Sequence, residues 1–174
     1  KVAPLRIPDT EGGHPGWLPD NSGFFYNQLT GKVGTPERYL NSRARFHRLG
    51  ADPARDPVIV AATRDTALKI DRIQTPLVFT APGSRHAVLL LSDVRQEMRV
   101  LVAPLADVVA GRARWQAVAG FDDEVTGVDL HGDDLILLAH RGHPRGRLLK
   151  TSAVKPSLAT AREIVPESKL VLEG

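Results

Sequence analysis

A turn followed by a short apolar strand recurs along this chain, and the spacing of the copies constrains the fold more than any other feature. In two copies the strands cover 87–91 and 135–138, and each follows a turn rich in glycine and polar residues. Three pairs of equivalent positions are offset by 48 residues: Ala87 and Leu135, Arg99 and Arg147, and Trp115 and Glu163. A repeat of about 40–50 residues that contains several short strands is typical of the blades of a β-propeller.

Each repeat is predicted to hold four antiparallel strands, because turn residues separate four short apolar or alternating segments. The first copy is longer than the others, mainly through the segment 31–42. The predicted strands are 16–18, 24–26, 45–49 and 57–60; 77–79, 87–91, 99–103 and 114–118; and 125–128, 135–138, 147–151 and 162–165. We therefore expect an all-β fold, a partial β-propeller of about three four-stranded antiparallel blades at 12–62, 75–120 and 124–168.

Three blades are too few to close a ring, since propellers contain at least four blades and closure protects the strand edges. The last residues, 170–174, resemble the start of a further strand. We therefore expect residues 1–174 to be a fragment of one propeller domain within a longer chain. The alternative is that copies of the chain associate through exposed blade edges.

Helical segments are expected to be few. Residues 158–163 could form one turn of helix. Residues 103–110 have some helical character, but Pro104 and the strand before it favour a loop. Elsewhere apolar residues do not recur at helical spacing over more than about two turns, and prolines interrupt most of the chain.

The composition excludes several classes of function. The net charge is +3 and acidic residues accompany most of the arginines, so we expect a mixed, solvated surface and no nucleic-acid partner. No apolar run approaches the ~20 residues that cross a membrane as a helix. The chain has no cysteine, which excludes disulfides and thiolate metal sites. No phosphate-binding or dinucleotide motif is present, so no cofactor is predicted. The composition is compatible with a cytoplasmic or a periplasmic location.

Three local patterns add information to the repeat. Residues 17–26 read Trp-Leu-Pro-Asp-Asn-Ser-Gly-Phe-Phe-Tyr, and residues 46–50 read Phe-His-Arg-Leu-Gly with Asp56 downstream. The apolar strand 135–138 is followed by an arginine-bearing loop and then by Gly-Arg-Leu-Leu at 146–149. Together these patterns resemble the N-terminal propeller of the prolyl oligopeptidase family of serine peptidases, and the resemblance extends over most of the chain.

The resemblance implies that the catalytic Ser, Asp and His lie in an α/β-hydrolase domain of the same parent chain, after the propeller. This chain contains no Gly-x-Ser-x-Gly elbow, so no catalytic residue is predicted within it. The implied partners are that hydrolase domain and a short peptide substrate, and the propeller would limit the access of peptides to the active site. The alternative is a non-enzymatic propeller that binds a ligand or another protein.

The direction of the strands predicts which end of the blades carries the site. Because antiparallel strands alternate in direction, the loop between the second and third strands of a blade lies at the same end as the connections between blades. These segments, which we name the loop end, are 30–42, 63–74, 94–98, 120–124 and 140–146. The resemblance implies that the loop end meets the hydrolase domain. Arg64, Asp65, Arg141 and Arg145 are therefore the candidate substrate-cavity residues, since an arginine there can bind a peptide carbonyl or carboxylate.

Two further patterns suggest chemistry but have simpler explanations. His140 and His143 have a spacing that can bind zinc on a helix, but they lie in a loop without a nearby third ligand, so no metal site is predicted. Ser152 and Lys155 match the Ser-x-x-Lys pattern of penicillin-recognising enzymes. The partner motifs of those enzymes are missing from this sequence, which makes a chance match the better interpretation.

Other polar residues are expected to be structural. His47 lies on a predicted strand and is interpreted as a hydrogen-bonded structural histidine. Asp133 and Asp134 lie at the tip of a predicted hairpin, and Asp122 and Asp123 precede a predicted strand. All four aspartates are interpreted as turn formers, because their side chains can accept hydrogen bonds from nearby backbone amides.

Overall fold

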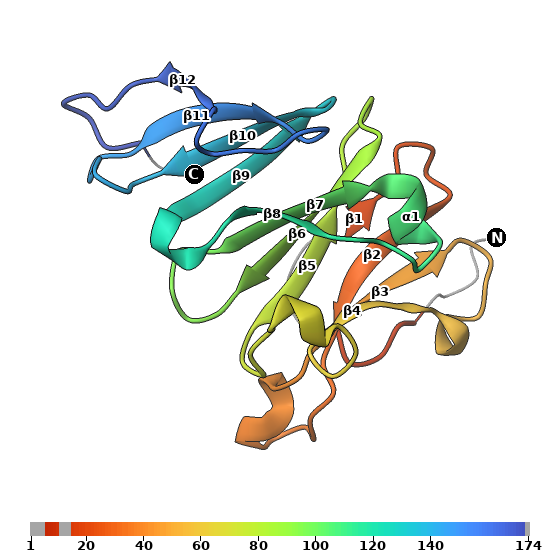
Figure 1. The fold of residues 1–174 in the computed structure, drawn as a ribbon. Helices are drawn as coiled ribbons and strands as arrows, with labels where there is room; N and C mark the ends of the chain where they lie inside the picture. The colour runs from red at the N-terminus through yellow and green to blue at the C-terminus, as the bar shows by residue number, and fades with distance from the viewer. Residues whose placement is uncertain (1–5, 11–14, 173–174) are drawn as a thin grey trace.

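A computed structural model describes residues 6–10 and 15–172, and in these residues the chain forms three four-stranded antiparallel sheets (Figure 1). The first blade contains β1 (Gly16–Trp17), β2 (Gly23–Gln28), β3 (Arg43–Arg48) and β4 (Val58–Ala61). The second contains β5 (Thr75–Phe79), β6 (His86–Ser92), β7 (Arg99–Pro104) and β8 (Gln116–Ala119). The third contains β9 (Val125–His131), β10 (Asp134–Ala139), β11 (Arg147–Ser152) and β12 (Arg162–Val165). The predicted all-β partial propeller of three four-stranded blades is confirmed, and the sheets do not close into a ring.

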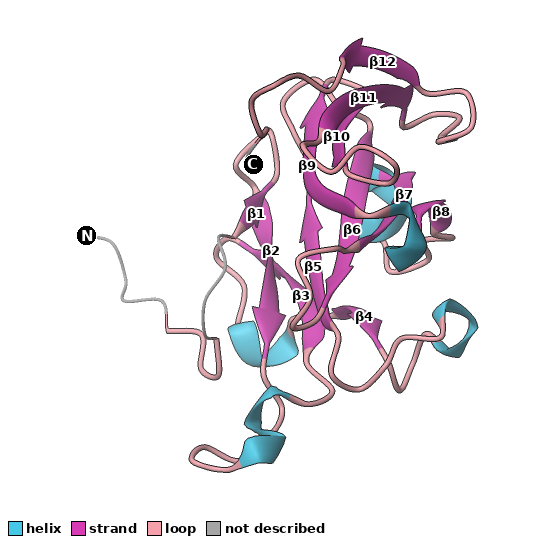
Figure 2. Ribbon diagram, turned by 90° about the vertical axis from the view of Figure 1, so that its left-hand side faces the viewer, coloured by secondary structure: helices cyan, strands magenta, loops and turns pink. Residues whose placement is uncertain are grey.

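Helices in the described residues are confined to the connections between strands (Figure 2). They are the short α-helix α1 (Leu105–Val109) and the 3₁₀ helices η1 (Pro36–Tyr39), η2 (Pro53–Arg55), η3 (Thr66–Leu68) and η4 (Phe121–Asp123). No helix among the described residues is long and apolar enough to cross a membrane.

The second blade lies between the other two and buries both of its faces (Figure 1). Successive strand residues point to opposite faces of a sheet. On β6, Ala87, Leu89 and Leu91 pack with residues of the first blade, whereas Val88 packs with residues of the third. All four side chains are fully buried. This explains why 87–91 is uninterruptedly apolar, since polar residues would be buried on either face.

The repeat extends to an irregularity at the outermost strand of each blade. The pairing register shifts opposite Ala44 and Arg45 on β3, opposite Val100 and Leu101 on β7, and opposite Leu148 and Leu149 on β11. The shift lies at the second and third residues of the strand in every blade. A bulge bends a strand and increases its twist. The three blades therefore share one bend at the same place, which the sequence pattern did not predict.

The helix α1 contradicts the prediction of a loop at 103–110. Pro104 precedes the helix rather than interrupting it, so the missing amide of proline removes no helical hydrogen bond. Val108 is fully buried against the core between the first and second blades, which stabilises a helix too short to form alone. Gly111 follows with a positive φ of 69°, a conformation that ends helices and suits glycine.

Two other expectations near the ends of blades were wrong. Residues 158–163 form no helix: the Ala161 amide donates to the carbonyl of Leu158 at 3.2 Å in a single turn, and β12 begins at Arg162. The offset between Trp115 and Glu163 also fails, because the residue equivalent to Glu163 is Ala117: they pair with Leu149 and Leu101 at the same place in their blades. The difference arises in the connection that carries α1, 105–115, which is longer than its counterpart 153–161 in the third blade.

The end of the chain also differs from the expectation of a further strand at 170–174. Residues 170–172 are not in a strand, and the Leu172 amide donates to the carbonyl of Arg145 at 2.8 Å. Residues 173–174 lie outside the described residues, as does the predicted start of the first blade at residue 12. The blade limits 12–62, 75–120 and 124–168 therefore stay a prediction.

Candidate functional site

Arg64 and Asp65 lie directly after β4, where the chain passes from the first blade to the second. The Asp65 carboxylate accepts a hydrogen bond from the Ala61 amide at 2.9 Å, which fixes this turn to the strand. The guanidinium of Arg64 donates to the carbonyl of Val58 on β4 and, at 3.0 Å, to the carbonyl of Gly111 beyond α1. Arg64 thus joins the outer strand of the first blade to a connection of the second.

Arg141 and Arg145 lie in the loop between β10 and β11 of the third blade. Arg141 Nη1 donates to Asp123 Oδ1 at 3.1 Å, and the Arg141 side chain is 66% exposed. The Arg145 amide donates to Glu167 Oε1 at 2.9 Å, and its guanidinium donates to the carbonyl of Ser168 at 3.4 Å. Arg141 therefore faces solvent with most of its donors, whereas Arg145 fastens its loop to the segment after β12.

The four candidates form two separate groups on the loop end. Within the described part of the chain, no hydrogen bond or ion pair joins Arg64 or Asp65 to Arg141 or Arg145. Arg64 and Asp65 lie in the connection from the first blade to the second, whereas Arg141 and Arg145 lie in the β10–β11 loop within the third blade. The geometry therefore does not bring the four residues together in one binding pocket, and each pair would have to contact a ligand or domain separately.

The loop end exposes the large apolar side chains of Val33, Tyr39, Ile73 and Val94, and Leu170 and Val171 are exposed in the segment after β12. Elsewhere the exposed large apolar side chains are Leu49 and Val154 in the loops after β3 and β11, Trp17 at the end of β1, and Ile164 and Val165 on β12. Val94 is 98% exposed at the tip of the loop between β6 and β7. Where exposed apolar side chains form a contiguous patch, they mark a surface that meets another protein or domain.

The loop that carries Val94 is held in place by its neighbours. The Arg95 guanidinium lies 3.5 Å from the centre of the Phe121 ring and pairs with Asp93 at 2.6 Å. Hydrogen bonds from the side chain and amide of Arg95 lower the pKa of Asp93 below its usual value. Sequence reasoning missed this cluster, although the alternation of Asp93 and Arg95 in a predicted loop was a visible signal. The exposed Val94 is therefore presented on an ordered loop.

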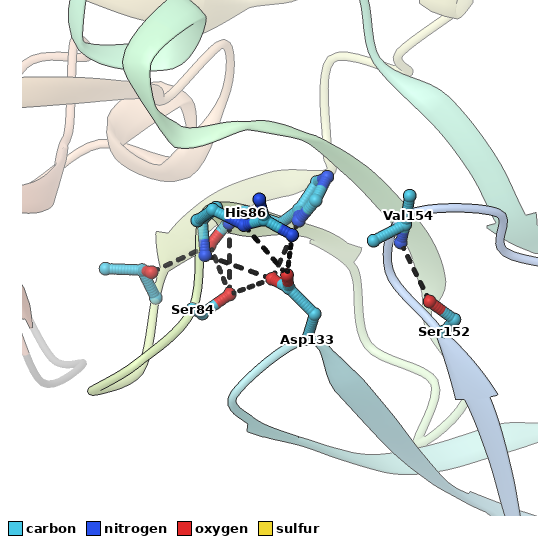
Figure 3. Close-up of polar contacts among 7 residues, drawn as sticks. Ser84, His86, Asp133, Ser152 and Val154 are labelled. Carbon is cyan, nitrogen blue, oxygen red and sulfur yellow. Dashed lines mark hydrogen bonds and ion pairs between the residues drawn. The ribbon is translucent and has the colours of Figure 1, made fainter.

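The histidines of the third blade have separate partners. His140 Nε2 lies 3.0 Å from Thr126 Oγ1, and His143 Nδ1 lies 3.4 Å from Glu167 Oε2. Across the described ranges, no group of three or more metal-binding side chains is present. The Ser152 hydroxyl accepts a hydrogen bond from the Val154 amide at 3.2 Å, so it closes a local turn (Figure 3).

Asp133 has a role that sequence reasoning missed. The prediction of a turn former was incomplete, because its carboxylate joins the third blade to the second (Figure 3). Oδ1 lies 2.8 Å from His86 Nδ1 and accepts hydrogen bonds from the Ser84 hydroxyl at 3.1 Å and the Arg85 amide at 3.0 Å. The hydrogen bond from His86, helped by those from the Arg85 amide and Ser84, holds the pKa of Asp133 well below its usual range.

A visible signal for this contact was the repeat itself. His86 and Asp134 occupy the first position of equivalent strands, β6 and β10. Asp133 precedes that position by one residue, at the tip of a tight hairpin where Gly132 has a positive φ of 57°. Residues about one repeat apart are neighbours in adjacent blades. An aspartate at the tip of one hairpin and a histidine at the start of the equivalent strand in the blade before it therefore predict a contact between the blades.

His47 is a buried, hydrogen-bonded histidine, as predicted. It is fully buried on β3, and its Nδ1 lies 3.0 Å from both carboxylate oxygens of Asp56. Asp56 Oδ2 also accepts a hydrogen bond from the Tyr26 hydroxyl at 3.0 Å. Burial and this hydrogen bond raise the pKa of Tyr26 well above its usual range. The cluster fixes the β3–β4 connection to the face of the first blade that points away from the second.

Comparisons with known proteins agree with this architecture. The family model described as "Prolyl oligopeptidase, N-terminal beta-propeller domain" matches residues 2–174. A curated relative, the prolyl endopeptidase of Elizabethkingia meningoseptica, is 25% identical over 165 residues, which cover 90% of this chain and 21% of the relative.

Solved structures give the same result for the fold. A structure from a study of two prolyl endopeptidases superposes with a TM-score of 0.70 at 24% identity, over 90% of this chain and 22% of that one. Prolyl oligopeptidase B from Galerina marginata, bound to a 25mer macrocyclization substrate, superposes with a TM-score of 0.75 at 16% identity, over 94% and 22%. The chain thus spans about a fifth of the length of the proteins it matches.

Proposed function

Since this chain belongs to the family of prolyl oligopeptidase N-terminal β-propeller domains, we propose that it is part of the propeller of a serine peptidase and limits the access of peptides to the active site. The catalytic groups would lie in an α/β-hydrolase domain of the same parent chain. In this account the loop end rests on the hydrolase domain, and only short peptides reach the space between the two domains.

The exposed apolar side chains of the loop end carry this proposal. Val33, Ile73 and Val94 come from three different connections, yet all are about half exposed or more. Burying an exposed valine or isoleucine side chain contributes about 1.5–3 kcal/mol. Two or three such contacts would hold a domain against this end. Contacts at the rim of this interface would contribute less, so the propeller and the hydrolase domain could still separate and admit a substrate.

Among the candidate cavity residues, Arg141 is the best placed to bind a substrate. Its guanidinium uses one nitrogen for Asp123 and is otherwise exposed, so it can donate to a peptide carbonyl or carboxylate. Arg145 and Arg64 donate to backbone carbonyls, and Asp65 accepts from a backbone amide. We propose that these three residues shape the loops and that Arg141 contacts the peptide.

The access proposal is tested on the full-length peptidase that carries this chain. We expect Ile73→Asp and Val94→Asp to weaken domain contact and to raise the hydrolysis of a long unfolded peptide relative to a short chromogenic peptide several-fold. Val154→Asp, which makes the same change at the opposite end, should leave the ratio unchanged. A ratio that stays constant in all three variants, or that changes as much with Val154→Asp, would contradict the proposal.

The role of Arg141 is tested by comparing substrates with a free and an amidated carboxyl terminus. A charge-assisted hydrogen bond contributes about 1.5–3 kcal/mol, so Arg141→Ala should lower kcat/KM about tenfold or more for the free carboxylate. The amidated peptide should be affected much less. Arg162→Ala, at an exposed position on β12, serves as the matched control. Equal losses for both substrates would exclude carboxylate binding by Arg141.

A further inference from the structure

An apolar groove lies between the first and second blades at the end opposite the loop end. Its volume is about 880 Å³. The apolar walls are formed by Leu18, Pro19, Leu105, Ala106, Val109 and Ala110. These residues come from the β1–β2 hairpin of the first blade, and from α1 of the second blade with Ala110 directly after it. All the walls belong to this chain, and the groove is independent of the surface used in the proposed function.

The helix α1, which forms one wall of this groove, occurs among the described residues only in the second blade. The corresponding connections, 49–57 and 153–161, contain no α-helix. The helix is firmly seated, because Val108 is fully buried and the Leu105 amide donates to the carbonyl of Arg85 at 2.8 Å. Because α1 is already held in place, little conformational entropy is lost there when a ligand binds, which favours affinity.

Two arginines flank the apolar walls. Arg48 is exposed at the end of β3, with its guanidinium carbon 6.0 Å from the centre of the Phe46 ring, and, after local hydrogen bonds, its charge contributes to lowering the pKa of the nearby Asp20 carboxylate. Arg85 is 83% exposed on its side chain and makes long contacts of 3.3–3.4 Å with Asp133. Both arginines are among the residues that line the groove, and a guanidinium group can bind a carboxylate in a bidentate manner.

The remaining polar group on the rim suits a peptide backbone. Asp20 Oδ1 accepts a hydrogen bond from the Ser22 amide at 2.9 Å, and hydrogen bonds from the amide and side chain of Ser22 lower the pKa of Asp20 below its usual value. A carboxylate has several acceptor sites, so Asp20 can also accept a hydrogen bond from the N–H of an extended peptide. A simple amphiphile with one anionic head would use one arginine and leave Asp20 facing apolar atoms. The rim therefore suits a peptide chain, which offers backbone N–H donors as well as side-chain carboxylates.

We propose that this groove binds an extended peptide segment in which apolar side chains lie beside acidic ones. The apolar side chains fill the space between the β1–β2 hairpin and α1. The carboxylates bind Arg48 and Arg85 at the rim. Such a site would give the propeller a second binding surface, remote from the loop end.

The proposal is tested by fluorescence anisotropy with fluorescein-labelled Asp-Leu-Leu-Asp amide. We expect saturable binding that weakens as salt is raised, because the arginine contacts are partly screened. The labelled peptides Lys-Leu-Leu-Lys amide and Asp-Ser-Ser-Asp amide should bind at least about tenfold more weakly, since each lacks one of the two interactions. Equal binding of all three peptides, or no binding of the acidic peptide, would overturn the proposal.

Variants locate the site on the surface. Arg48→Glu and Ala106→Glu should each weaken the acidic peptide at least about fivefold, because a carboxylate then repels the ligand. Ala106→Glu places an acidic residue in the first turn of α1, where it favours the helix, so a loss of binding would not reflect unfolding. Arg55→Glu makes the same charge change at the same end but outside the groove and should bind normally. Unchanged binding in both groove variants, or equal loss with Arg55→Glu, would refute the assignment.

Discussion

The contact of Asp133 with the second blade is predicted to stabilise the molecule by a measurable amount. In Asp133→Ala, the Arg85 amide and the His86 ring lose their acceptor, whereas the Ser84 hydroxyl keeps the carbonyl of His86 as a partner at 3.2 Å. A hydrogen bond to a charged group contributes about 1.5–3 kcal/mol. The Asp133 side chain is 20% exposed, which places both lost bonds at the low end of that range.

The expected cost is therefore about 2–3 kcal/mol of unfolding free energy, with little added by the exposed Arg85 guanidinium. For a chain of this size the melting temperature should fall by about 5–10 °C. Asp133→Asn keeps an acceptor but loses the charge, so about half of the loss is expected. Urea unfolding followed by circular dichroism measures each variant against the wild type.

The matched control is Asp134→Ala, one residue further along. Asp134 is 45% exposed and pairs with Lys150 on its own blade, so its loss should cost less than about 1 kcal/mol. If Asp133→Ala costs no more than Asp134→Ala, then the carboxylate does not join the two blades and the reasoning is refuted.

The same contact predicts a dependence on pH. The pKa of Asp133 is lower in the folded state than in the unfolded chain, where it is about 3.9. A carboxylate of this kind contributes its full stability above the unfolded pKa and loses it as the pH falls towards the folded value. The difference in stability between the wild type and Asp133→Asn should therefore be constant from about pH 5 upward and shrink below about pH 4. A difference that stays constant down to pH 3 would contradict this account.

Three further predictions concern the blade cores. Leu89→Ala removes a fully buried side chain between the first and second blades and should cost about 3 kcal/mol in urea unfolding. Gly16→Ala would place a Cβ 2.3 Å from the Val78 carbonyl oxygen, so we expect a loss of about 2 kcal/mol or more, and a neutral result would contradict the close approach of these inner strands. Tyr26→Phe removes one hydrogen bond to Asp56 and should cost about 1 kcal/mol, and because its raised pKa keeps the Tyr26 phenol protonated, the tyrosine ionisation seen in ultraviolet titration of the folded protein at alkaline pH should not change.

The repeat made the strands predictable, but not every connection. The offsets of Ala87 and Leu135 and of Arg99 and Arg147 hold in the structure, because these residues begin or nearly begin equivalent strands. The helix α1 was missed since its helical period covers little more than one turn, and burial of Val108 rather than local preference stabilises it. A pattern read along the sequence does not reveal such tertiary stabilisation.

The sequence predicted where the candidate site residues lie, but not which hydrogen-bond partners they have. Strand alternation placed Arg141 and Arg145 on one end of the molecule, but it could not show that Arg145 would donate to Ser168. The partners of an arginine depend on how loops fold over one another, and the sequence contains no periodic signal for that. Asp133 was misjudged for the same reason, because a turn former and an inter-blade acceptor look alike in a single hairpin.

The most direct test of the proposed assembly is site-specific cross-linking in the full-length protein. A photoreactive phenylalanine analogue is placed at position 94 on the loop end or at position 154 on the opposite end. We expect position 94 to cross-link to a segment that contains the catalytic serine, identified by its reaction with a fluorophosphonate probe, and position 154 not to do so. Cross-links to that segment from position 154, with none from position 94, would contradict the central claim that the loop end faces the catalytic domain.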